Sequence, residues 1–219
     1  MSHIVLVRHG QANSGARDEQ SYDRLSALGH EQAHWLGAHF EGSRERFARV
    51  YCGTLRRHRE TAEGIGAEAH AEVVEDARLN ELHYFDMARL FEEQHGEAVP
   101  EGREAFAAHM PRMFAAWRDG RLEGVPERFE VFDTRVRDVL REIAEGEGRA
   151  LVVTSGGLIG TVMGQAMGLS LDAVCRVCLA IMNTSLHRYQ LLGGEMLRTQ
   201  FNAVPHLEHP ERQFAQTHI

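Results

Sequence analysis

The sequence contains no lysine, so all 24 of its basic side chains among 219 residues are arginine. The acidic side chains number 32, which gives a formal net charge of −8. No arginine-rich run or basic stripe is present, and nucleic-acid-binding proteins normally carry one. We therefore expect no nucleic-acid partner.

Cysteines and long apolar runs are also scarce. An odd number of cysteines, here three, without a secretion signal argues against a disulfide framework. Cys175 and Cys178 have a Cys-x-x-Cys spacing, but no two further ligands lie nearby, which favours core packing over a zinc site. The N-terminal apolar segment is too short for a signal peptide, and no run approaches a membrane span. We expect a cytoplasmic protein that has no membrane partner.

The first residues carry the strongest pattern in the chain. Residues 4–7 (Ile-Val-Leu-Val) predict a buried strand, and Arg8, His9 and Gly10 follow it directly. Ligands of open α/β folds bind beyond the carboxyl ends of the strands. An arginine fork suits phosphate oxygens, and a neutral imidazole can attack phosphorus or carry a proton. Gly10 would allow a close approach of the backbone to a ligand, or a positive φ.

Strand and helix patterns alternate along the chain. Strands are predicted at 4–7, 49–52, 73–75, 150–153, 184–190 and 196–201, and helices at 27–40, 55–68, 128–145 and from the turn at 154–157 to about 167. This alternation predicts an α/β fold, a three-layer α/β/α sandwich with a mainly parallel sheet. Residues 11–24 are predicted as a loop, and the polar tail from Pro205 as loosely ordered.

The segment at about 76–126 differs from the rest of the chain. Short helical pieces there are interrupted at Gly96, at 100–102, at Pro111 and at Gly120. We interpret this segment as a helical cap inserted over the crevice, within a single domain that spans residues 1–219.

A second candidate site lies where the strand at 150–153 ends. Ser155, Gly156 and Gly157 would stand at a helix N-terminus, whose free N–H groups and dipole attract anions. Ser155 could donate a hydrogen bond to a phosphate. A plain N-cap followed by tight-turn glycines explains this stretch equally well.

Two further side chains are candidates on weaker local patterns. Arg57, near the start of the helix at 55–68, would lie on a face that can look into the crevice, although a solvated helix face is the commoner fate of a single arginine. Glu81 follows the third strand and could act as a general acid near a transferring phosphoryl group. Taken locally, an ordinary loop glutamate is the simpler interpretation.

Together these stretches resemble the histidine phosphatase superfamily, in its phosphoglycerate mutase-like branch. The first strand runs into the family's Arg-His-Gly, and residues 23–29 match its Asp before a Leu-Ser-x-Leu-Gly helix start. Leu55, Arg57, Thr61 and Ala62 keep the frame of its Ser-Pro-Leu-x-Arg-Ala-x-x-Thr-Ala motif. Residues 79–81 match its Leu-x-Glu. The likeness extends from residue 4 to about residue 190.

The resemblance implies a phosphatase that hydrolyses a small-molecule phosphomonoester in two steps. His9 would become phosphorylated, and Glu81 would protonate the leaving oxygen and then activate water. Arg8 and Arg57 would clamp the phosphoryl oxygens together with Ser155 and Gly156. The remaining candidates for the phosphate pocket are Gly10, Asn13 and Gly157. No metal or other cofactor is expected, because the arginines supply the positive charge. A homodimer is an expectation from the family alone.

The chain departs from the family pattern at several positions. Ser155 stands where the family usually carries a second pocket histidine, and Gly15 where it tends to carry an asparagine. Gly53 and Thr54 replace Ser-Pro, and His58 replaces an alanine. Because the phosphate pocket would lack the hydrogen-bond donor of that second histidine, we expect slow turnover of generic esters and a gain in kcat for Ser155→His. His83 and His187 are the first candidates to compensate, unless Ser155 is itself a fitted phosphate ligand.

Other functions remain open on the sequence alone. A mutase would return the phosphoryl group to a second hydroxyl of its substrate. A weakly active or inactive relative would serve as a binding protein, which the loss of the second histidine favours. A cysteine phosphatase is disfavoured, because the residue six positions after Cys52 is His58 and not arginine. A metal hydrolase is also disfavoured, since no two-histidine helix motif is visible.

Overall fold

The computed structural model describes residues 3–13 and 15–218, and six strands in this part of the chain form one mixed sheet. The strand order is β3-β2-β4-β1-β5-β6. The strands are β1 (His3–Arg8), β2 (Arg49–Cys52), β3 (Val73–Glu75), β4 (Arg149–Thr154), β5 (Leu186–Leu192) and β6 (Glu195–Ala203). The first four are parallel, and β5 and β6 form an antiparallel hairpin at one edge. The predicted, mainly parallel sheet is confirmed.

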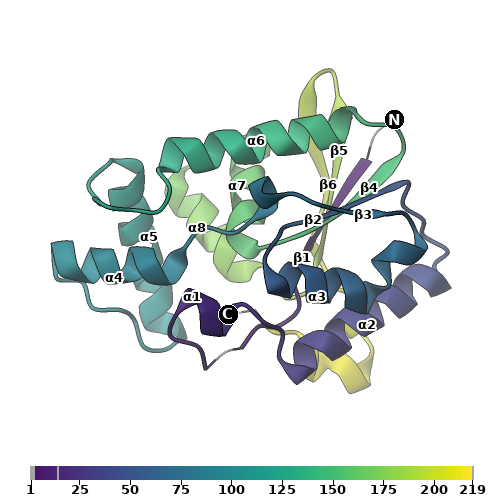
Figure 1. The fold of residues 1–219 in the computed structure, drawn as a ribbon, viewed down its shortest axis with the longest axis horizontal. Coiled ribbons are helices and arrows are strands. Elements are labelled where there is room, and N and C mark those ends of the chain that lie inside the picture. Colours follow the sequence, from purple (N-terminus) through teal and green to yellow (C-terminus); the bar gives the residue numbers. More distant parts are fainter. Residues whose placement is uncertain (1–2, 14, 219) are drawn as a thin grey trace.

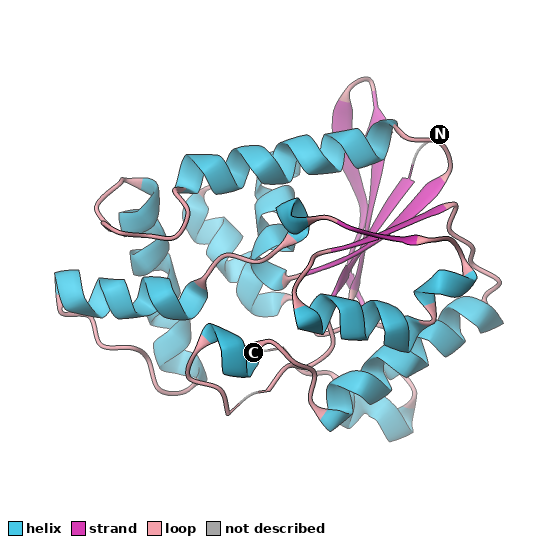
Figure 2. Cartoon of the chain, viewed as in Figure 1, coloured by secondary structure: helices cyan, strands magenta, loops and turns pink. Residues whose placement is uncertain are grey.

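The helices connect these strands and gather on both sides of the sheet (Figures 1 and 2). They are α1 (Glu19–Tyr22), α2 (Ala27–Gly42), α3 (Arg56–Ile65), α4 (Tyr84–His95), α5 (Arg103–Arg118), α6 (Phe129–Glu145), α7 (Gly156–Met167) and α8 (Leu171–Ala180). Short 3-10 turns lie at η1 (Ala67–Ala69), η2 (Ala77–Leu79), η3 (Pro205–Leu207) and η4 (Pro210–Ala215). Among the described residues, no helix is both long enough and apolar enough to span a bilayer.

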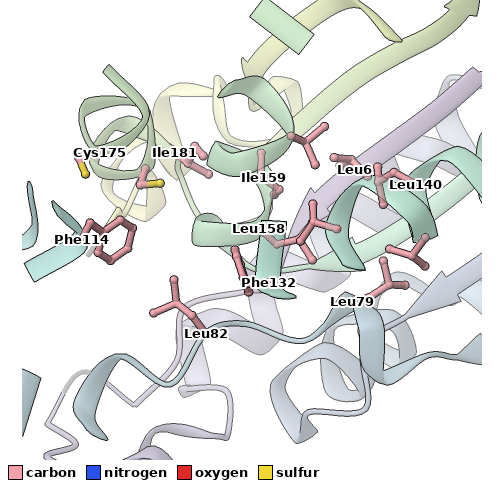
Figure 3. Packing of buried hydrophobic residues seen from close by; sticks show 14 of the residues in the cluster. Leu6, Leu79, Leu82, Phe114, Phe132, Leu140, Leu158, Ile159, Cys175 and Ile181 are labelled. Atoms are coloured by element: carbon pink, nitrogen blue, oxygen red, sulfur yellow. The ribbon is translucent and has the colours of Figure 1, made fainter. Parts of the chain in front are cut away.

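Alternate side chains of the central strands fill two separate cores. Val5 and Val7 of β1 pack with α2 and α3 on one face of the sheet. Ile4 and Leu6 pack on the other face with α6, α7 and α8, in the larger cluster that Figure 3 shows around Phe132 and Leu158. A strand buried on both faces is apolar at every position, as residues 4–7 are. The predicted α/β sandwich is therefore confirmed.

Some local predictions were wrong where packing overrides local preference. Helix α5 continues through Pro111, although the sequence predicted an interruption there. Proline costs a helix about 3 kcal/mol, but Met110, Met113 and Trp117 of the same helix are buried in the larger core, which offsets that cost. Within the predicted loop at 11–24, residues 19–22 form the short helix α1.

The C-terminal tail is packed rather than loosely ordered, which corrects the sequence prediction. Leu207 and Ala215 are buried in a small cluster with Trp35 of α2. Gln32 Nε2 donates to the carbonyl of Ala215 at 2.7 Å. The tail is therefore fixed by contacts that are remote in sequence and that a polar composition does not reveal.

Deeply buried histidines couple the stability of the fold to pH. Burial, reinforced by nearby cations, lowers the pKa of His187 and of His206 to about 3. Between that value and an unfolded pKa of about 6.5, the unfolded chain binds more protons than the folded one. Stability is therefore fully present above about pH 6.5 and falls as the pH decreases below it.

We expect the free energy of unfolding to be at least about 2–3 kcal/mol lower at pH 5.5 than at pH 7.5, since each histidine contributes up to about 1.4 kcal/mol per pH unit. Urea titrations at the two pH values measure this difference. His206→Gln should reduce it by about 1.4 kcal/mol, because it removes one of the two groups. An unchanged free energy across this pH range would contradict the prediction.

Candidate active site

The carboxyl ends of three neighbouring parallel strands bring the predicted residues together. Arg8 pairs with Thr154 in the register of β1 and β4, and the His9 N–H donates to the Thr154 carbonyl at 2.8 Å. His9 therefore lies beside Ser155. Strand β2 joins the same edge, where the Gly53 N–H donates to the Val153 carbonyl at 3.2 Å.

His9 is buried and neutral. Burial, followed by the positive charges of Arg57 and Arg8, holds its pKa well below the usual range. Its Nδ1 lies 2.7 Å from the Gly10 carbonyl, which can only accept, so the proton is on Nδ1. Nε2 therefore carries the lone pair. A neutral imidazole with a free Nε2 has the form of a nucleophile.

Arg57 is only 2% exposed, which excludes the solvated helix face considered from the sequence. Its Nη1 donates to Asp23 Oδ1 at 3.0 Å, and its guanidinium stacks on the Tyr22 ring at 5.1 Å. The same carboxylate accepts the backbone N–H groups of Arg56 and Arg57. Asp23 thus fixes both the start of α3 and the arginine. In the sequence, Asp23 stands out only as the first residue of the motif at 23–29.

Two buried arginine donors in this cluster have no partner among the described residues. Nε of Arg8 and Nε of Arg57 are buried without a hydrogen bond to any described residue. Buried donors are normally paired, and leaving one unpaired costs about 1–3 kcal/mol. The charges of both guanidinium groups also act on the neighbouring His9, so the cluster concentrates positive charge and has the chemistry of an anion site.

At the start of α7, a carboxylate covers the helix N-terminus. Glu81 Oε2 accepts the Gly157 N–H at 2.8 Å, and a Cβ at position 157 would lie 2.4 Å from Glu81 Oε1. Gly157 is therefore required for this contact. At Gly156 an added Cβ would meet the Arg8 guanidinium only at 3.6 Å, which is ordinary contact. Ser155 occupies the N-cap position, but its side chain makes no capping hydrogen bond, contrary to one sequence-based alternative.

Gly10 and Asn13 have roles in packing. Gly10 does not have the positive φ considered from the sequence; instead, a Cβ there would lie 2.5 Å from the Gly29 carbonyl oxygen of α2. Asn13 Nδ2 donates to the Ser21 carbonyl at 2.9 Å, so its amide ties the loop together. Both residues shape the turn that carries His9 and the loop that carries Tyr22.

His58 is a member of the cluster that sequence reasoning missed. Its Nε2 lies 2.6 Å from Ser155 Oγ, and its ring centroid lies 5.8 Å from that of His9. Neither histidine named from the sequence pairs with Ser155. His187 uses both ring nitrogens on Ser185 Oγ and the Asn202 N–H, and the side chain of His83 is 54% exposed. The sequence signal that could have identified His58 was its replacement of the alanine in the family motif.

Thiol and metal chemistry find little support in the described residues. Burial raises the pKa of Cys52 to about 11, so this thiol stays protonated at neutral pH. No group of three or more histidine, cysteine, aspartate or glutamate side chains in residues 3–13 and 15–218 is arranged to hold a metal ion.

Comparisons with known proteins identify the family. The family model of the histidine phosphatase superfamily (branch 1) matches residues 4–203. A probable phosphoglycerate mutase from Serratia proteamaculans is 30% identical, over 96% of this chain and 97% of its own length. A glucosyl-3-phosphoglycerate phosphatase from Mycolicibacterium vanbaalenii is also 30% identical, over 77% of this chain and 76% of its own length.

Solved structures share the fold. A mutant phosphoserine phosphatase from Entamoeba histolytica, crystallised with phosphoserine, superposes with a TM-score of 0.70 at 17% identity. The match covers 94% of this chain and all of the other one.

Proposed function

Because the chain belongs to the histidine phosphatase superfamily (branch 1), we propose that it hydrolyses small phosphomonoesters through a phosphohistidine intermediate. The observation that carries this proposal is the pairing of a neutral His9, its Nε2 unprotonated, with the unpaired buried donors of Arg8 and Arg57. In the proposed reaction His9 is the nucleophile, and the two guanidinium groups bind the phosphoryl oxygens.

In the first step, His9 Nε2 attacks phosphorus and the ester P–O bond breaks. Arg8 and Arg57 stabilise the charge on the phosphoryl oxygens, and Ser155 and the Gly156 N–H add hydrogen bonds. Glu81 gives its proton to the leaving oxygen. In the second step the Glu81 carboxylate takes a proton from water, whose oxygen attacks phosphorus and releases phosphate from His9.

We further propose that residues 76–126 act as a cap that selects the leaving group. Helix α4 begins beside helix α1, which ends at Tyr22, because the Phe85 N–H donates to Glu19 Oε1 at 2.9 Å. The rings of Tyr22 and Phe85 lie 5.6 Å apart, and Tyr22 also contacts the His9 ring edge-on at 6.3 Å. The cap therefore reaches His9 through one intervening ring, that of Tyr22.

Phosphoryl transfer within one substrate is the second candidate, supported by the name of the Serratia relative. The two reactions differ only in the acceptor. Water accepts the phosphoryl group in hydrolysis, whereas a second hydroxyl of the substrate accepts it in a mutase.

The proposal is tested by measuring phosphate release from p-nitrophenyl phosphate, phosphoserine and glucosyl-3-phosphoglycerate, each with and without excess EDTA. We expect turnover that EDTA leaves unchanged, because two arginines supply the positive charge that a metal would provide. Activity that EDTA abolishes and Mg²⁺ or Zn²⁺ restores would contradict the metal-free mechanism. Isomerised 3-phosphoglycerate without phosphate release would favour the mutase, and no reaction with any ester would favour a binding protein.

A further inference from the structure

Three departures from the family pattern, far apart in the sequence, meet in the folded protein. They are Gly53 in place of serine, His58 in place of alanine and Ser155 in place of histidine. His58 Nε2 contacts Ser155 Oγ at 2.6 Å. A Cβ at Gly53 would lie 2.2 Å from His58 Nδ1, which is closer than real Cβ contacts occur. The His58 ring can therefore keep its position only if residue 53 is glycine. His58 therefore fits against both Gly53 and Ser155.

The position of His58 is that of a pocket residue. Its side chain is fully buried, and its ring centroid lies 5.8 Å from that of His9. It follows Arg57, whose guanidinium belongs to the anion site. His58 Nδ1 is buried without a hydrogen-bond partner among the described residues, so Ser155 provides the one hydrogen bond of this ring.

The direction of the hydrogen bond between His58 and Ser155 determines whether Ser155 can donate to a phosphate. A hydroxyl has one proton to donate, and a phosphoryl oxygen accepts. If His58 Nε2 carries its proton and donates to Ser155 Oγ, the Ser155 proton is free for the phosphoryl oxygen. In this tautomer the buried, unpartnered Nδ1 of His58 carries only a lone pair and no proton. The opposite tautomer would direct the Ser155 proton to His58 and present lone pairs to the anion.

We infer that His58 is a positioning residue of the phosphate pocket, which orients the Ser155 hydroxyl toward the phosphoryl group. The pocket thus contains a second imidazole, as the family pattern does, but this imidazole comes from α3 instead of from the end of β4. It acts on the phosphoryl group indirectly, through the Ser155 hydroxyl. This inference rests on the proposed function. It also reverses the expectation from the sequence for Ser155→His, because a second imidazole at position 155 would overlap the ring of His58.

The test is a double-mutant cycle with His58→Ala, Ser155→His and the two combined. Each single variant should lower kcat about 100-fold, as the loss of one oriented donor does in other oxyanion sites. The double variant should return to within about 10-fold of wild type, because alanine at 58 leaves room for an imidazole at 155. Such recovery cannot come from two independent structural defects.

Two further variants separate positioning from folding. His58→Gln keeps a donor for Ser155 and should retain more kcat than His58→Ala, with the same melting temperature as a check on folding. His206→Gln removes a buried histidine that contacts the Thr184 hydroxyl at 2.8 Å, and it leaves in place the Thr184 N–H, which donates to the Arg8 carbonyl at 3.0 Å. It should lose stability but keep kcat. Full activity in His58→Ala, or a double variant as slow as the singles, would overturn the inference.

Titration with inorganic phosphate distinguishes this inference from the proposed function. Wild type should bind phosphate at least ~10-fold more tightly than His58→Ala, since an oriented hydroxyl donor is lost. If wild type releases no phosphate from any ester, the proposed function fails and the titration alone decides on His58. Equal binding by wild type and His58→Ala, or no binding by either, would overturn the inference.

Discussion

Replacing His9 with alanine is expected to lower kcat on every phosphomonoester by at least ~1,000-fold and to remove the covalent intermediate. Loss of the nucleophile in an enzyme with a covalent intermediate costs up to about 10⁶-fold. The burial of His9 and the hydrogen bond from its Nδ1 to Gly10 leave only Nε2 for the attack. Rapid quench with ³²P-labelled ester measures the intermediate, which as phosphohistidine should be acid-labile.

The same experiment reports on the neighbours of His9. Acid-labile label that persists in His9→Ala but disappears in His58→Ala would move the nucleophile to the second imidazole, 5.8 Å away. Acid-stable label would indicate phosphoserine and thus Ser155. Either result would contradict the assignment of His9. The control is His206→Gln, which should be labelled as strongly as wild type.

Replacing Glu81 with glutamine should slow alkyl esters by about 100- to 10,000-fold, the range typical of a lost general acid. A nitrophenolate leaves without protonation, so p-nitrophenyl phosphate should lose less than ~10-fold in the step that forms the intermediate. Glutamine preserves the shape, and its carbonyl oxygen can still accept the Gly157 N–H. Single-turnover measurements on phosphoserine and p-nitrophenyl phosphate give the two rates.

Glu142→Gln is the matched control for this prediction. Glu142 pairs with Arg78 at the surface, where its side chain is 66% exposed, so the substitution removes the same charge without touching the site. It should leave both rates unchanged. An equal loss on both esters in Glu81→Gln, or no loss on either, would remove Glu81 from the role of general acid.

The site depends on a loop that looked unstructured in the sequence. Asp23 holds Arg57 and the first N–H groups of α3, and Tyr22 stacks on the same guanidinium. The loop is fastened in turn by the Leu25 N–H, which donates to Glu60 Oε2 at 2.7 Å. These bonds join residues more than thirty positions apart. No local pattern reveals them, whereas the resemblance of the surrounding motif pointed to Asp23.

The sequence by itself determined the core strands of the sheet and the position of His9 at its edge. Strands buried on both faces must be apolar at every position, so runs such as 4–7 and 150–153 could be predicted as strands without knowledge of tertiary contacts. The turn between β5 and β6 consists of Gly193 and Gly194, which both have the positive φ that a tight hairpin turn requires. A polar turn directly after a buried strand placed Arg8 and His9 at the ligand-binding edge.

Only the tertiary structure decided which histidine completes the pocket. Positions 58 and 155 are 97 residues apart, and the sequence treated them as two unrelated departures from a motif. A hydrogen bond and a steric fit depend on where side chains meet, and hydrophobic periodicity carries no information about that. The packed tail and the passage of α5 through Pro111 have the same origin, since burial against remote elements outweighs local preference.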